Sequence, residues 1–133
     1  MNQSSEVVAL KRGVNKFFAS CPMLGDPYDW RIKLISKSTA CRIDNLEEMK
    51  KARLSPRDIE QNWLNTENFV KRSVFNVIKT HKIVKANLQE LRAVYRGEEA
   101  QIAQVDEGRI ERETEREINN LWCETMWGHS PLN

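Results

Sequence analysis

The chain has 133 residues, of which 40% are hydrophobic and 30% are charged, with only five Gly and four Pro. This length suits one domain with its own core, and the composition excludes an intrinsically disordered chain. The net charge of +2 hides an asymmetry, since residues 66–97 carry seven Lys or Arg against two Asp or Glu, and residues 98–133 carry three against nine.

The cysteines and the apolar runs predict an intracellular protein of a reducing compartment, the cytoplasm or the nucleus. Cys21, Cys41 and Cys123 are an odd set, and their spacing fits neither a disulfide framework nor a zinc knuckle. The first residues lack the long apolar run of a secretory signal. No stretch approaches the ~18 apolar residues of a membrane span, so we expect no membrane partner.

The first predicted element is a helix over residues 5–20. Apolar residues from Val7 to Phe17 fall on one helical face, and Ser4 or Ser5 can cap the N-terminus. Pro22 ends the helical pattern.

One or two short connecting helices are expected next. Residues 30–43 fit the alternation of a strand or the face of a short helix, and we favour a helix because the sequence offers no second strand. Asp44 and Glu47 match a capping box, which predicts that a separate short helix begins there and runs to Leu54.

A long basic helix is expected over about residues 56–96. Ser55 as N-cap and Pro56 at the first helical position predict its start, and no further Pro or Gly interrupts it. Unbroken, it would measure on the order of 60 Å, which makes the fold elongated. Its apolar stripe has the 3/4 spacing of a coiled-coil seam, which must be buried against other helices of this chain or of a partner. The stripe consists of Trp63, Val70, Val74, Val77, His81, Val84, Leu88, Leu91 and Tyr95.

An acidic helix over about residues 98–127 is expected to follow. Gly97 is placed as the turn of an antiparallel hairpin, although it can also be a weak point within one continuous helix. Gly108 marks a kink or break, and Gly128 ends the helix. The predicted fold is therefore all-α: a single domain over residues 1–133, a helical bundle built on a long antiparallel αα-hairpin.

Nothing in the sequence indicates catalysis, a cofactor or a metal. His81 lies in the apolar stripe without a second ligand at metal-binding spacing, so we interpret it as a polar residue that sets helix register. The glutamates between Glu107 and Glu117 lack the pocket that acid–base chemistry needs, and we interpret them as a solvated or docking face. An enzyme whose site is completed by another subunit is the remote alternative.

The sequence instead favours a non-enzymatic interaction module or adaptor, a small subunit of a larger assembly. Its partners would be one or more proteins, a second copy of the chain included. Tryptophan is enriched at interface hot spots, and chain ends usually need a partner to hold them. The predicted partner-binding residues are Leu121, Trp122, Met126 and Trp127, with Phe69 and Phe75 on a second face of the long helix.

The alternative function is phosphate binding by a small nucleic-acid-associated protein. Five basic residues of the long helix would make the contacts, although no recognition motif accompanies them. They are Lys71, Arg72, Lys79, Lys82 and Lys85.

Overall fold

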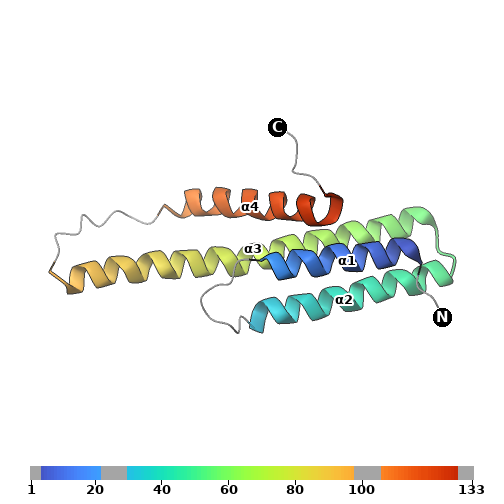
Figure 1. Ribbon diagram of the computed structural model, residues 1–133, viewed down its shortest axis with the longest axis horizontal. Coiled ribbons are helices and arrows are strands. Elements are labelled where there is room, and N and C mark those ends of the chain that lie inside the picture. Colours follow the sequence, from blue (N-terminus) through green and yellow to red (C-terminus); the bar gives the residue numbers. More distant parts are fainter. Residues whose placement is uncertain (1–3, 22–29, 98–105, 129–133) are drawn as a thin grey trace.

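The computed structural model describes residues 4–21, 30–97 and 106–128, and these ranges are helical apart from short turns. No strand occurs in the described ranges, so the predicted all-α class is confirmed. Four helices follow one another, as Figure 1 shows: α1 (Ser5–Ser20), α2 (Trp30–Lys51), α3 (Pro56–Tyr95) and α4 (Glu107–Trp127).

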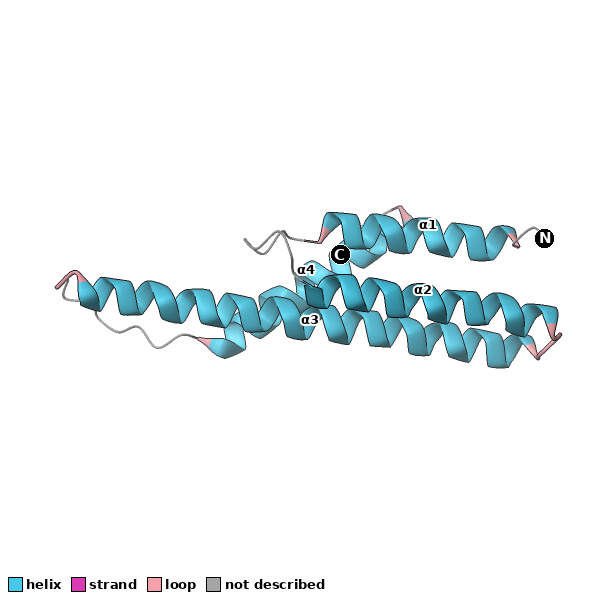
Figure 2. Cartoon of the chain, turned by 90° about the horizontal axis from the view of Figure 1, so that it is seen from below, coloured by secondary structure: helices cyan, strands magenta, loops and turns pink. Residues whose placement is uncertain are grey.

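The helices form a bundle in which consecutive helices run in opposite directions (Figure 1). Helix α1 contacts α2 and α4, and α3 contacts the same two helices, which places α1 and α3 on one diagonal of the bundle. Helices α2 and α4 pack along the first part of α3, and α1 lies diagonally across the bundle from it. The C-terminal part of α3 continues past them, as the view from below also shows (Figure 2).

Three helices begin with a side chain that accepts a hydrogen bond from a free backbone N–H of the first turn. Ser4 caps α1 by accepting from the N–H of Val7, and Ser55 caps α3 by accepting from that of Asp58. Each cap satisfies a donor that the helix itself leaves unpaired. The predicted starts at residues 5 and 56 are confirmed.

Helix α2 is one continuous helix, so the predicted break at Asp44 is wrong. Asp44 pairs with Lys11 of α1 at 2.7 Å, and the Glu47 carboxylate accepts a hydrogen bond of 3.3 Å from the Ser4 N–H. The two acids therefore contact α1 instead of capping a helix of their own. The helix stays continuous because one buried face runs through this point, formed by Thr39, Ile43, Leu46 and Glu47.

Helix α3 is unbroken from Pro56 to Tyr95, Arg96 is its C-cap, and the next residue, Gly97, has a left-handed φ of 68°. A continuous helix through Gly97 is thereby excluded. Helix α4 begins at Glu107 with Asp106 as its N-cap, so Gly108 lies in the first turn and not at a kink. Residues 98–105, which the sequence assigns to the acidic helix, lie outside the described residues.

The core is centred on Trp122, which is 1% exposed. Its ring packs edge-on against Phe17 of α1, with the centroids 5.2 Å apart, and is stacked on Trp63 of α3 at 6.1 Å. Three helices therefore meet at one indole ring. The rest of the core cluster consists of Val7, Val14, Ile43, Val70, Val74, Val77, Ile78 and Ile118.

We call residues 84–95 of α3 the arm; they belong to the C-terminal part of the helix, which projects from the bundle (Figure 1). At 1.5 Å per residue the arm is roughly 18 Å long. None of its residues is buried. Every core residue of α3 precedes it.

Candidate protein-docking site

An uncovered apolar stripe runs along the arm. Val84, Leu88, Leu91 and Tyr95 continue, at helical spacing, the line of Val70, Val74 and Val77 that faces the core. Their exposed fractions are 51, 46, 58 and 90%. The seam was predicted to be buried against helices of this chain or of a partner; among the described residues, its first half is buried and its second half is about half exposed or more. We call these four residues the arm stripe.

The extent of the neighbouring helices explains where the burial of the apolar line of α3 ends. Lys79 and Lys82 of α3 pair with Glu111 and Glu117 of α4, at 2.5 and 3.0 Å. Helix α4 begins only one turn before Glu111, so its described residues cannot reach along the arm. Figure 2 shows that α2 also begins short of the arm.

Basic side chains flank the arm stripe on the side that faces α4 in the bundle. Lys85 follows Lys82 by three residues, Arg92 follows Lys85 by seven, and Arg96 follows Arg92 by four. These spacings keep all four cations on one helical face. Within the described ranges, no ion pair is formed by these last three residues, whereas Lys82 is neutralised by Glu117.

The structure splits the predicted partner-binding cluster at the end of α4. Trp122 belongs to the core, while Leu121 and Met126 are partly buried against it. Only Trp127 offers a large exposed surface, at 53%. The Trp122 side chain therefore has no area left for a partner in this fold.

Phe69 and Phe75 are partly buried and are covered by cations of the chain itself. The Arg42 guanidinium lies 4.0 Å from the centroid of the Phe69 ring, and the Lys79 ammonium lies 5.7 Å from that of Phe75. Cation–π contacts of this kind stabilise partly exposed rings. Neither ring is as open as the arm stripe.

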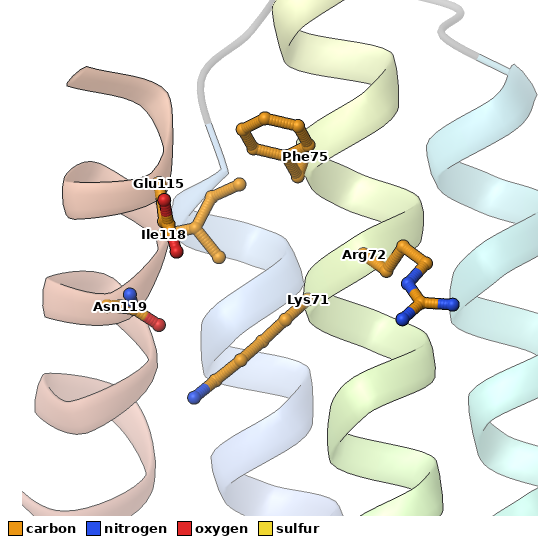
Figure 3. A pocket seen from close by; sticks show the side chains of 6 residues that line it. All are labelled: Lys71, Arg72, Phe75, Glu115, Ile118 and Asn119. Atoms are coloured by element: carbon orange, nitrogen blue, oxygen red, sulfur yellow. The ribbon is translucent and has the colours of Figure 1, made fainter. Parts of the chain in front are cut away.

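The five predicted phosphate-binding cations do not form one free basic surface. Lys71 pairs with Glu67 at 3.0 Å, and Lys79 and Lys82 pair with glutamates of α4. Lys71 and Arg72 line a groove of about 290 Å³ between α3 and α4, but their charged ends point in opposite directions (Figure 3). Three of the five cations are therefore neutralised within the chain, two of them by the acidic helix α4.

No reactive or metal-binding cluster accompanies the apolar surface in the part of the chain that the structure describes. There, no group of three metal-ligating side chains occurs, and His81 is half-buried in the seam. Burial raises the pKa of the Cys21 thiol to about 11, which keeps it neutral. A hydrogen bond from Arg109 lowers the pKa of Glu113, as expected for an exposed ion pair.

Comparison of the chain with protein-family models, with curated proteins and with solved structures gives no significant match. Among the helices that the structure describes, none is both long and apolar enough to cross a membrane. The site must therefore be interpreted from its own chemistry.

The residues of the arm stripe are recognisable in the sequence, but only as part of a seam buried against helices of this chain or of a partner. The signal that distinguishes the two halves is helix length: α3 has 40 residues, whereas α1, α2 and α4 have 16, 22 and 21. At these lengths, the described helices leave part of α3 without a helix packed beside it. Which part remains bare follows only from the register of the helices.

Proposed function

We propose that the protein is a non-enzymatic helical interaction module that docks a partner protein along the arm. The observation that carries this proposal is the arm stripe, four large apolar side chains in line with the core-facing residues of the same helix. A contiguous apolar surface of this kind on an otherwise folded protein is typical of a protein–protein contact. It replaces the end of α4 as the favoured docking surface.

Docking would work by apolar anchoring with charged rims. Full burial of a Leu or Val side chain stabilises a complex by roughly 1.5–3 kcal/mol before the entropic cost of association is subtracted. Leu88 and Leu91 lie in the middle of the arm stripe and are the expected anchors. The flanking cations would set orientation and association rate more than affinity.

The arm is also suited to docking because it is separated from the core. Its stripe residues contribute nothing to the core cluster, so a partner can cover them without rearranging the bundle. The bundle then acts as a support that holds one half of α3 rigid while the other half is presented. This division between a folded body and a presented helix suits an adaptor or a small subunit.

The proposal is tested by co-purification of partners with a tagged chain from its native cells. We expect Leu88→Asp with Leu91→Asp to remove at least one specific partner. The matched control is Leu34→Asp with Leu64→Asp, two exposed leucines outside the arm, which should retain it. Partner sets that are the same for both variants would contradict docking along the arm.

A further inference from the structure

We infer that the arm binds an acidic amphipathic helix of another protein, whose glutamates or aspartates pair with Lys85, Arg92 and Arg96. This inference rests on the proposed function and names the chemistry of its partner. Two observations carry it: how α3 already binds α4, and which side chains flank the arm stripe.

The contact between α3 and α4 shows what kind of helix this face accepts. Helix α4 places Ile118 and Trp122 in the core and glutamates at its edge, where Lys79 and Lys82 of α3 pair with Glu111 and Glu117. The contact is thus an apolar seam with cations on α3 and carboxylates on the neighbouring helix. The apolar line of α3 runs on into the arm, so the arm extends an interface already formed in the bundle.

The flanking charges of the arm repeat the α3 half of this contact. Lys85, Arg92 and Arg96 continue the face of Lys82. The single acidic residue between them, Glu90, lies off that face, because it shares the face of Ala86, four residues earlier. A helix that extends along the arm on the side occupied by α4 would therefore meet three cations. Carboxylates at its edge neutralise them, whereas a basic helix would be repelled.

A second copy of the arm is a poorer occupant. In an antiparallel pair of arms, the side that carries Lys85 and Arg92 would face the same side of its copy, so that cations oppose cations. A parallel pair would bring both bundles to the same end, where α4 and α2 already occupy the space beside α3 (Figures 1 and 2). Charge and shape both favour a different, acidic partner.

The test uses two labelled synthetic helical peptides with the same leucine seam, one flanked by Glu and the other by Lys. Their binding to the full chain is measured by fluorescence anisotropy at low salt. We expect the Glu peptide to bind at least about tenfold more tightly than the Lys peptide. The preference should weaken as salt screens the charges.

Charge reversal on the arm provides the decisive comparison. Lys85→Glu with Arg92→Glu and Arg96→Glu should invert the preference, so that the Lys peptide binds more tightly. The matched control, Lys16→Glu with Lys37→Glu and Arg57→Glu, changes the net charge equally at exposed residues outside the arm and should retain the original preference. Circular dichroism checks that both variants remain helical.

The other outcomes distinguish this inference from the proposed function. Equal binding of both peptides, lost in Leu88→Asp with Leu91→Asp, would overturn the acidic partner but leave docking along the arm intact. Dimerisation through the arm without peptide binding, seen by light scattering, would make a second copy the occupant. If neither peptide binds and the chain stays monomeric, the arm is no docking surface and both proposals fail.

Discussion

Gly13 lies in the middle of α1 at a point where α4 passes close by. A Cβ atom there would lie 2.6 Å from Met126 Sδ and 3.3 Å from the carbonyl oxygen of Thr125. Glycine costs about 1 kcal/mol in a helix interior relative to alanine, so its presence here is explained by the approach of the two helices.

We expect Gly13→Val to lower the free energy of unfolding by about 1–3 kcal/mol, because the added methyl groups overpack this contact. Urea unfolding measures the loss. Part of the clash is with the flexible Met126 side chain, so the same substitution should cost less in a Met126→Ala background. An equal loss in both backgrounds would show that Met126 does not limit the space at Gly13.

Cys21 and Cys41 differ in burial and should differ in reactivity. The Cys21 thiol is partly buried, with a pKa raised from 9.0 to about 11, whereas Cys41 is exposed. At pH 8 the thiolate fraction of Cys21 is then about a hundredfold lower than that of an unperturbed thiol, and the thiolate is the reactive form.

Single-cysteine variants that retain only Cys21 or only Cys41 test this difference with a thiol-specific dye. We expect slow labelling of Cys21 at pH 8, with a rate that keeps rising as the pH approaches 11. Cys41 should react rapidly at pH 8. Equal rates in the folded protein would contradict the burial of Cys21.

At the scale of elements, the end of α4 combines a core residue and a surface residue of the same type. Trp122 contacts Phe17 and Trp63, and its Nε1 has no hydrogen-bond partner within the described ranges. Trp127, five residues later, is about half exposed. The two tryptophans therefore serve as matched probes of the packing of α4.

We expect Trp122→Ala to cost about 3–5 kcal/mol of unfolding free energy and Trp127→Ala less than about 0.5 kcal/mol. Trp122→Phe should cost less than Trp122→Ala, because it keeps a ring in the core and removes an unpaired donor. Denaturant unfolding gives all three values. A small effect of Trp122→Ala would show that α4 is not anchored at this ring.

Some elements could be predicted from the sequence because their signals are local. The starts of α1 and α3 depend on a side chain and an N–H three residues away, and no other part of the chain is needed to recognise Ser55 and Pro56. The signal at Asp44 is also local, but its carboxylate is satisfied by Lys11 of another helix. A capping pattern therefore predicts a helix start only where no tertiary partner competes for the side chain.

The candidate site was less predictable because exposure is a property of the assembled bundle. Leu88 and Val74 have the same place in the repeat, yet Leu88 is 46% exposed and Val74 is buried, because the described residues of α2 and α4 pack beside the first half of α3. Trp122 is the opposite case, because it was predicted to bind a partner and lies in the core. A tryptophan near the end of the sequence gives the same apolar pattern in either place.

At the scale of the whole molecule, one long helix links a packed body to an uncovered arm. The body is held by the aromatic cluster around Trp122 and by the cross-helix ion pairs of Lys79 and Lys82. Exposed pairs of this kind contribute only about 0.2–1 kcal/mol each, so they define register more than stability. The function that we propose depends on the arm being uncovered in the isolated chain.

The most direct test of this claim compares two substitutions in the same apolar stripe, Val74→Ala in the body and Leu91→Ala in the arm, by urea unfolding of the isolated protein. Val74 is fully buried, so its truncation should cost about 2 kcal/mol. Leu91 is 58% exposed, so its truncation should change the free energy of unfolding by less than about 0.5 kcal/mol. Similar losses at both positions would show that the arm stripe is covered in the isolated chain, and would contradict the account.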